Sequence, residues 1–302
     1  MRSNNARNKR LTLQRLARGA TLTNNTGQHT MITLEQVKST TLLQDDAQQW
    51  ALENLDYINS KLPLLGSSLK VEKGEKEGYY TSILYLQPAN KVSKVTLCAG
   101  AKVNGCLEDC LISSGQLGMD VAQRAATRRS IIYLLDSKRF YAMLESEIEK
   151  RHAKYGDKLA VRLNGTSDVD FTAFIATMPH VRFYDYSKVY RRLEHNGLPN
   201  YDITYSGSAY NDKALAITAR AVIKGHRVAL AFNTAERKGE FKMPNNVADF
   251  DTTDLRFLDD NVVGGLKFKG GSVAKRAAMM DKPSFFFTPA TFDKLNNIIA
   301  RG

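Results

Sequence analysis

Short apolar runs recur along the second two-thirds of the chain and are separated by stretches with helical spacing. Most of these runs are dense in Val, Leu, Ile and aromatic residues rather than alternating with polar residues, as in strands that are covered on both faces. Strands that alternate with helices in this way predict a parallel α/β sheet. The predicted strands occupy residues 94–98, 158–163, 181–186, 201–205, 227–232, 247–250 and 262–268.

Seven or eight such strands over about 200 residues predict a (β/α) barrel of the TIM type. A doubly wound open sheet is the main alternative. No G-x-G-x-x-G and no G-x-x-x-x-G-K-[ST] follows a strand, so the usual nucleotide-binding fingerprints are absent from the sequence.

Helical spacing is clearest over residues 119–155, with a break near residues 136–137. Phe140, Tyr141, Leu144 and Ile148 form one apolar stripe in the second half of this stretch. Two further helices and an earlier strand, rich in aromatic and β-branched side chains, are predicted at residues 44–60, 213–224 and 79–86.

This pattern divides the chain into two predicted parts. We expect residues 92–302 to form the barrel and to carry the functional site. Residues 1–91 are expected to form a basic N-terminal arm and an extension that packs on the barrel.

The composition is that of an ordinary globular protein, with 43% hydrophobic and 25% charged residues. No uncharged apolar run approaches the length of about 18 residues that spans a membrane, and the N-terminus lacks the apolar segment of a signal peptide. Three cysteines without a secretion signal favour a reducing compartment, so we expect a cytoplasmic protein with no membrane partner.

The formal net charge is +12, and half of it lies in residues 1–18. This arm contains no acid and no aromatic residue. It is either a solvated tail or an arm that contacts the phosphates of a nucleic acid. Its basic residues are Arg2, Arg7, Lys9, Arg10, Arg15 and Arg18.

All three cysteines lie within 13 residues, in the pattern C-x7-C-x3-C. Cys98 closes a predicted strand, while Cys106 and Cys110 follow in a glycine-containing loop. Residues beyond the carboxyl ends of strands are where α/β folds build their sites. The cluster of cysteines is therefore the strongest candidate for chemistry in this chain.

Three interpretations of the cysteines compete. The leading one is a [4Fe-4S] cluster held by three thiolates, which leaves one iron open to water, a carboxylate or a substrate. Structural zinc fits less well, because it needs a fourth ligand and favours C-x2–4-C pairs. Buried thiols without a ligand are the third interpretation. An open iron indicates Lewis-acid chemistry.

Polar residues follow the predicted strands and form a rim suited to a small anionic substrate. Asp249 is the first candidate for the fourth iron ligand and Asp251 the second; they share a face because strand side chains alternate. Lys267 and Lys269 also share a face and could bind the anion. The alternatives are an acidic loop in which Asp251 caps a short helix, and lysines that simply lie on the surface. Further rim residues are Asn164, Thr166, Ser167, Asp168, Asp170, Ser187, Lys188, Ser206, Ser208, Asn233 and Asp254.

The histidines are not expected to be metal ligands. None is spaced for ligation with another histidine, and His152 falls late in a helix, where its charge would suit the helix dipole. The five are His29, His152, His180, His195 and His226.

Residues 97–118, LCAGAKVNGCLEDCLISSGQLG, resemble the cysteine motif of the phage gene-product-88-like family. Four later segments match in the same order, and the resemblance covers about residues 92–270. It implies a barrel-like fold, a four-iron, four-sulfur cluster at one mouth of the barrel, and a phage protein acting in the host bacterial cytoplasm. Hydrolytic, ester-cleaving activity is one function that it implies. The later segments are residues 162–168, 183–188, 248–257 and 264–270.

A looser resemblance is to radical S-adenosylmethionine enzymes, which also place three cysteines after the first barrel strand. Their usual spacing, C-x3-C-x2-C, is absent here. The main prediction is therefore an iron–sulfur hydrolase that uses an open iron on an anionic substrate. The alternatives are a nucleic-acid-binding protein with a structural cluster and a radical enzyme.

Overall fold

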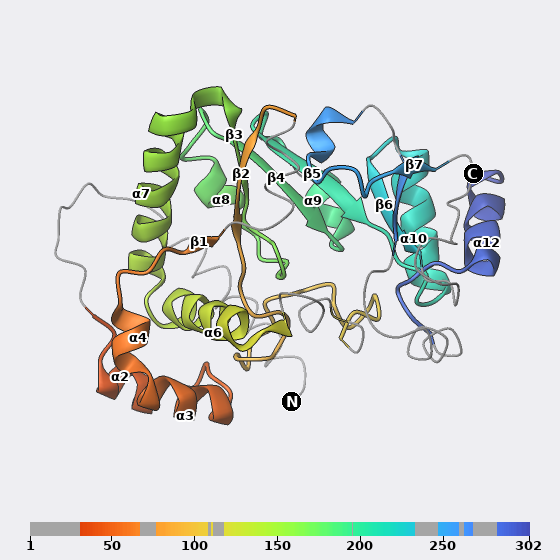
Figure 1. Cartoon of the computed structure of the whole chain (residues 1–302). Coiled ribbons are helices and arrows are strands. Elements are labelled where there is room, and N and C mark those ends of the chain that lie inside the picture. Colours follow the sequence, from red (N-terminus) through yellow and green to blue (C-terminus); the bar gives the residue numbers. More distant parts are fainter. Residues whose placement is uncertain are drawn as a thin grey trace. The chain divides into compact units, whose positions relative to one another are not determined.

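The computed structural model describes residues 31–66, 77–107, 110, 118–194, 196–232, 247–259, 263–267 and 283–302. These residues form a mixed α/β fold with one eight-stranded sheet, in the order β1-β2-β3-β4-β5-β6-β8-β7 (Figure 1). The strands are β1 (Leu65–Gly66), β2 (Tyr80–Leu84), β3 (Leu159–Arg162), β4 (Arg182–Ser187), β5 (Tyr201–Ser206), β6 (Val228–Phe232), β7 (Ala248–Asp249) and β8 (Val263–Lys267).

The sheet is mostly parallel. β1 pairs with β2 in the antiparallel direction, whereas β2–β3, β3–β4, β5–β6, β6–β8 and β7–β8 are parallel pairs. The helices are α2 (Leu34–Ser39), α3 (Asp45–Glu53), α4 (Leu55–Asn59), α6 (Asp120–Leu135), α7 (Ser137–Tyr155), α8 (Thr172–Ile175), α9 (Tyr190–Glu194), α10 (Asp212–Ile223) and α12 (Pro289–Ile299), with short 3-10 turns η3 (Gly156–Lys158) and η4 (Arg256–Leu258).

The predicted α/β class is confirmed. From β1 to β6 the strands follow one another in sequence order, as they do in a barrel. Among the described strands, β1 and β7 are the edges of the sheet, so closure into a barrel stays a prediction. The boundary at residue 92 is likewise untested, although β2 pairs with β3 over four residues and so brings part of the predicted extension into the sheet.

The strand predicted at residues 94–98 is wrong. In this stretch the backbone bonds several different segments instead of one ladder: Lys94 N–H donates to the Leu42 carbonyl and Leu97 N–H to the Ala89 carbonyl. The Thr96 hydroxyl accepts a hydrogen bond from the Cys98 N–H and donates one to the Cys98 carbonyl. Cys98 keeps a single parallel bridge to Asp168. A threonine that bonds its own backbone competes with strand pairing, which the apolar pattern alone did not show.

The described residues fall into two compact units. Unit 1 draws on the segments Met1–Ser67, Tyr80–Cys98 and Asp120–Phe183, and unit 2 on Ser68–Tyr79, Ala99–Met119 and Tyr184–Gly302.

Unit 1 is built around α6 and α7, which contact each other, and α7 also contacts β3. The break predicted near residue 136 is present, because the Asp136 carboxylate accepts a hydrogen bond from the Arg139 N–H at 3.0 Å and caps the start of α7. Aromatic rings fill the core behind it, in edge-to-face or stacked pairs that add to simple burial. These rings belong to Tyr133, Phe140, Tyr141, Phe171 and Phe174.

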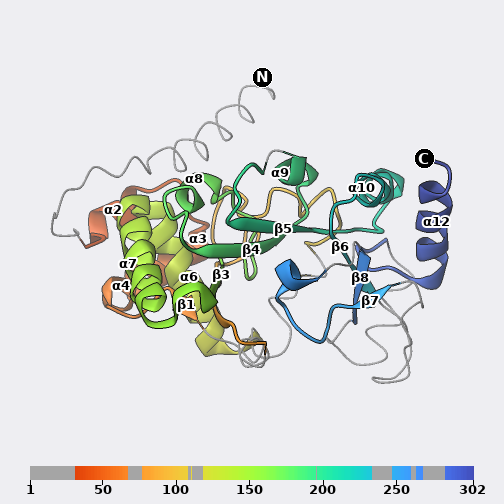
Figure 2. The same cartoon turned by 90° about the horizontal axis from the view of Figure 1, so that it is seen from above.

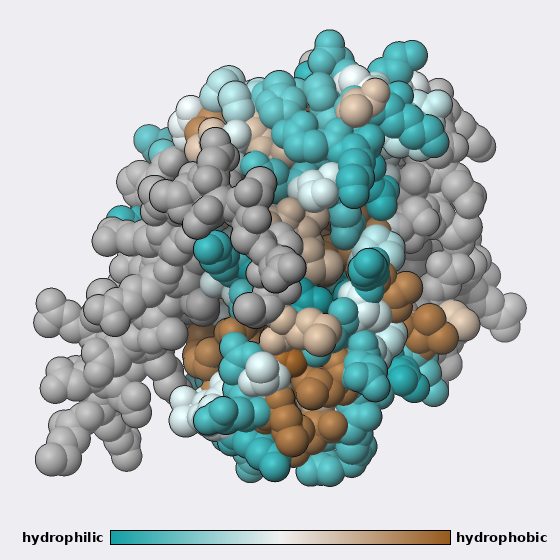
Figure 3. All heavy atoms as spheres, turned by 90° about the vertical axis from the view of Figure 1, so that its left-hand side faces the viewer, coloured by the Kyte–Doolittle hydropathy of each residue, from teal (hydrophilic) through white to brown (hydrophobic). Residues whose placement is uncertain are grey.

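The N-terminal helices of unit 1 leave some apolar side chains in solvent. Figure 3 shows the side of the molecule that lies on the left in Figure 1. Apolar side chains gather on its lower part, at the height of α2 and α4 in Figure 1. Met31 and Leu34 are 66% and 47% exposed, while Val37 on α2 is fully buried. α2 therefore packs through the side of the helix that carries Val37.

Unit 2 packs α10 and α12 against each other and α10 against β6. Figure 2 shows α9 and α10 on one face of β5 and β6, and the short η4 turn (blue) on the other. The Asn211 side chain caps α10, and Thr288 followed by Pro289 caps α12. The core between these elements includes Leu215, Ala219, Leu230, Phe232, Phe287, Phe292 and Leu295.

None of the helices within the described residues combines the length and the apolarity that crossing a bilayer requires.

Two buried tyrosines are expected to make unit 1 less stable at alkaline pH. Burial raises the pKa of Tyr133 to about 12. A hydrogen bond with Tyr141 lowers the same pKa, but its effect is smaller than that of burial. Burial also raises the pKa of Tyr141 well above its usual range. Since both folded pKa values lie above the unfolded value of about 10, their contribution is fully present below pH 10 and is lost as the pH rises towards 12.

We predict that the free energy of unfolding falls between pH 10 and 12, by at most about 1.4 kcal/mol per pH unit for each tyrosine. Denaturant unfolding at several pH values measures this slope. Tyr133→Phe is expected to make it shallower, while Tyr80→Phe, at a site that is 37% exposed, serves as the control. Equal slopes in wild type and Tyr133→Phe would contradict the assignment.

Candidate functional site

Cys98 lies beside the loop that follows the carboxyl end of β3. The Asp168 N–H donates to the Leu97 carbonyl at 2.9 Å. Asn164, only 2% exposed, fixes this loop: its Oδ1 accepts from the Ser167 hydroxyl and the Val169 N–H, and its Nδ2 donates to the Val169 carbonyl, all within 3.0 Å. One buried amide therefore satisfies three groups of the turn and gives Cys98 a fixed neighbour.

The Cys98 sulfur accepts a hydrogen bond from the Ala89 N–H at 3.2 Å and lies 3.8 Å from the Thr166 carbonyl. Ala89 has a φ of +47°, and among the described residues it is the one non-glycine with a positive φ. Such a backbone is strained for a residue with a Cβ, and strain of this kind gathers at functional sites. The S–H of Cys98 donates to the Thr166 carbonyl, so the sulfur bonds both an amide donor and a carbonyl acceptor.

Cys106 lies in the loop of residues 99–107, within unit 2, and Asn104 holds this loop. Asn104 is 4% exposed, and its Nδ2 donates to the carbonyls of Gly100 at 2.9 Å and Lys188 at 3.4 Å. Its own carbonyl accepts from the hydroxyl of Ser208, which is fully buried. Lys188 and Ser208 follow β4 and β5, so the loop is fastened to the carboxyl ends of two parallel strands.

Two glycines allow this loop to lie so close to its neighbours. Gly105 has a φ of +68°, and a Cβ there would lie 2.3 Å from Cδ2 and 2.7 Å from Cγ of Tyr210. A Cβ on Gly100 would lie 3.0 Å from the Cβ of Lys188. Any larger residue at position 105 would need both a strained backbone and a displaced ring.

Lys188 serves the strand ends rather than an open rim. Its ammonium donates to the carbonyls of Ser206 at 3.3 Å and Gly207 at 3.0 Å, and it lies 4.5 Å from the centre of the Phe285 ring. Backbone oxygens and an aromatic face both stabilise the cation. Within unit 2 the Lys188 ammonium therefore connects the residue that follows β4 to the end of β5.

The three cysteines are all half-buried. Cys98 belongs to unit 1, whereas Cys106 and Cys110 belong to unit 2. A cluster held jointly by the three thiolates stays a prediction.

Asp249, Asp251 and Lys267 meet where β7 and β8 run side by side. The Asp249 carboxylate accepts from the Asp251 N–H at 2.8 Å, and the Asp251 carboxylate accepts from the Lys267 N–H at 2.9 Å. Asp251 thus bonds a strand and not the short helix that was its alternative partner. Asp249 and the side chain of Lys267 are exposed. The other predicted rim residues Asn233 and Lys269 lie outside the described residues, as does the arm of residues 1–18.

A buried charged group lies near η4; Asp254 was predicted as a rim residue, whereas Arg256 and Asp259 were not. Arg256 is 1% exposed, pairs with Asp259 at 3.0 Å, and stacks over the Phe250 ring at 3.9 Å. Asp254, also buried, accepts from the Tyr186 hydroxyl at 3.3 Å. These residues fasten the segment after β7 to β4, and their isolated charges gave no periodic signal.

Two histidines whose spacing along the chain predicts no shared ligation lie close together in the structure. Within unit 1, His152 and His180 come together with Glu149, and one ligand atom of each lies within 4.8 Å of the others. The sequence carries part of this signal, since Glu149 and His152 are three positions apart and so share a helix face. His180 is 28 positions further on, which no local spacing shows.

The fold and the cysteine loops define a class: a mixed α/β protein in which Cys98, in unit 1, and the loop of Cys106, in unit 2, each lie beside the carboxyl ends of parallel strands. The sequence profile of one family, gene product 88, matches residues 62–282. Since this is well over half of the chain, the protein belongs to the gene product 88 family. No curated protein and no solved structure matches the chain.

Gly105→Ala tests the close packing of the Cys106 loop. Its matched control is Gly225→Ala, in the same unit, where φ is +74° but nothing lies within 4 Å of the added Cβ. We predict a loss of about 1 kcal/mol for the control and of about 2–4 kcal/mol for Gly105→Ala, because the ring of Tyr210 must also move.

Denaturant unfolding measures both changes, and thiol-reagent kinetics on Cys106 report whether the loop has shifted. Equal losses in the two variants would show that Tyr210 does not restrict position 105.

Proposed function

We propose that this protein binds a [4Fe-4S] cluster through Cys98, Cys106 and Cys110. The observation that carries the proposal is the amide of the strained residue Ala89, aimed at the sulfur of Cys98. Hydrogen bonds to sulfur are a recognised means of tuning such clusters. The spacing of the cysteines and the membership of the gene product 88 family support the same reading.

The donor chemistry of the chain fits this group. Three thiolates in 13 residues match a soft, sulfur-rich metal centre better than they match isolated zinc, for which no fourth ligand is evident from the spacing. The loop beside Cys98 is held by hydrogen bonds to the buried Asn164, and the loop of Cys106 is held by hydrogen bonds to the buried Asn104. An ordered loop loses less conformational entropy when a ligand binds to it, which supports the proposal for Cys98 and for Cys106 separately.

Three thiolates leave room for a fourth ligand, and Asp249 is our first choice for it, with Asp251 second. Asp249 uses one oxygen to accept the Asp251 N–H, and a carboxylate has a second oxygen for a metal. When bound, the cluster would supply an iron that acts as a Lewis acid. Lys267, exposed and positively charged, would attract the small anionic substrate of an ester-cleaving hydrolase. The sequential order of strands β2 to β6, with parallel pairs β2–β3, β3–β4 and β5–β6, supports a TIM-like barrel as the frame for this site.

The test is anaerobic purification followed by assays for iron, sulfide and zinc. We predict about four iron and four sulfide per chain in the wild type, and loss of both in Cys106→Ser. Asp249→Asn is expected to keep the cluster and to change its spectrum if Asp249 is the fourth ligand. The absence of sulfide, with zinc that is lost in Cys106→Ser, would rule out the cluster.

The same preparations test the reaction. With a cluster present, hydrolysis of 4-nitrophenyl phosphate is expected in the wild type and not in Cys106→Ser. A cluster without hydrolysis of this or a neutral 4-nitrophenyl ester would argue for a structural role and against the enzyme.

A second candidate function follows from the six cations of residues 1–18, which carry no compensating acid. We propose that this arm contacts nucleic-acid phosphates. Full engagement of six cations predicts a salt slope of about −5 in a log–log plot of affinity for duplex DNA. Fluorescence anisotropy of the full chain and of a variant lacking residues 1–18 measures the difference. Unchanged affinity after the deletion would exclude the arm as the binding element.

A further inference from the structure

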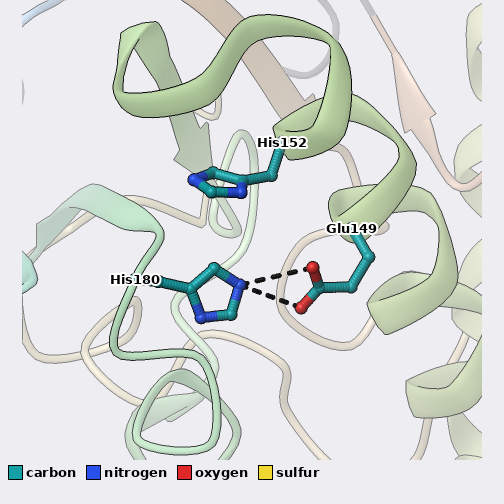
Figure 4. Close-up of side chains that lie close together, drawn as sticks. All are labelled: Glu149, His152 and His180. Atoms are coloured by element: carbon teal, nitrogen blue, oxygen red, sulfur yellow. Dashed lines mark hydrogen bonds and ion pairs between the residues drawn. The ribbon is translucent and has the colours of Figure 1, made fainter.

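Near the end of α7, one carboxylate and two imidazoles gather on the surface of unit 1. Glu149 and His152 lie on one face of α7, and His180 comes from the turn between α8 and β4 (Figure 4). His180 Nε2 lies 3.0 Å and 3.3 Å from the two oxygens of Glu149. The two imidazole rings are 4.9 Å apart and nearly perpendicular.

Two features separate this group from an ordinary surface ion pair. One ligand atom of each of the three residues lies within 4.8 Å of the other two. In addition, the His152 Nε2 is buried and has no hydrogen-bond partner among the described residues. An ion pair between Glu149 and His180 accounts for neither the approach of a second imidazole nor its unused ring nitrogen.

We propose that Glu149, His152 and His180 form a binding site for a divalent transition metal, with Zn²⁺ as the preferred ion. Two imidazoles and one carboxylate are a common zinc ligand set, and they leave a fourth position for water. Bonds of about 2.0–2.1 Å in a tetrahedron place ligand atoms roughly 3.3 Å apart, so the 3.0 Å contact needs only a small widening.

Metal binding here replaces a proton. The proton between His180 Nε2 and Glu149 passes to solvent when the ring is charged, or is replaced by one on Nδ1 when the ring is neutral, and the Nε2 lone pair then binds the metal. Lys150 and Arg151, which follow Glu149 on α7, are not ligands, so the site carries one negative charge against the two charges of Zn²⁺.

The position in the fold indicates a structural role. α7 leads through η3 directly into β3, and His180 stands two residues before β4. The site therefore lies at the amino ends of these strands, whereas Cys98 lies at the carboxyl end of β3. In barrel-like folds the amino-terminal side serves stability and the carboxyl-terminal side serves catalysis. The metal would join the end of α7 to the turn before β4, independently of any cluster at the cysteines.

The test uses untagged full-length protein, titrated with Zn²⁺ against a chromophoric chelator. We expect the wild type to bind one zinc per chain at this site. In His180→Asn and in Glu149→Gln the affinity for this zinc is expected to be at least about 100-fold weaker. His226→Asn, a histidine of unit 2, is the control and is expected to bind as the wild type does. Because all four proteins keep the three cysteines, zinc bound by thiolates cancels in the comparison.

Two further readouts accompany the titration. Saturating zinc is expected to raise the Tm of the wild type by about 5 °C and to leave that of His180→Asn unchanged. Co²⁺ is expected to give visible absorption bands without the intense near-ultraviolet charge transfer of thiolate ligands. His180 is 45% exposed, so its replacement does not threaten folding. No zinc binding by the wild type, or equal binding by His180→Asn, would overturn the site, and neither result bears on the cluster.

Discussion

The chain segments that follow the carboxyl ends of parallel strands contain buried polar groups, and these groups need hydrogen-bond partners. In each unit a buried asparagine supplies such partners. Asn164 satisfies three groups of the loop after β3, and Asn104 connects the cysteine loop to the residues after β4 and β5. A buried polar group without a partner costs about 1–3 kcal/mol, so these amides restrict each loop to one conformation. The placement of Cys98 and Cys106 depends on them.

The chain separates two kinds of metal-binding side chain. The soft sulfur atoms of Cys98 and Cys106 are carried by segments beside the carboxyl ends of strands, and one amide, that of Ala89, donates to the sulfur of Cys98. The harder imidazole and carboxylate ligands lie at the amino ends of β3 and β4 in unit 1. Since thiolates favour iron–sulfur clusters and imidazoles favour zinc, the two sites would not compete for the same group.

Much of the fold could be predicted from local pattern. The break between α6 and α7, the span of α10, and the strands from β3 to β8 agree with the sequence to within a few residues. The apolar pattern reports burial along one element: β3, β4 and β6 are buried along most of their length, and α10 buries one stripe. The stretch before Cys98 failed because the hydroxyl of Thr96 satisfies the backbone locally, an effect that leaves no trace in the apolar pattern.

The sequence by itself determined the cysteine motif, the order of helices and strands, and the family. Each of these is written in short-range spacing or in residue identity. Only the tertiary structure decided that Asn104 meets Ser208, that Ala89 points its amide at Cys98, and that His180 reaches Glu149 and His152. These contacts join residues that are distant along the chain or depend on one strained backbone angle. Their geometry is therefore set by how strands and helices pack, which spacing along the sequence does not encode.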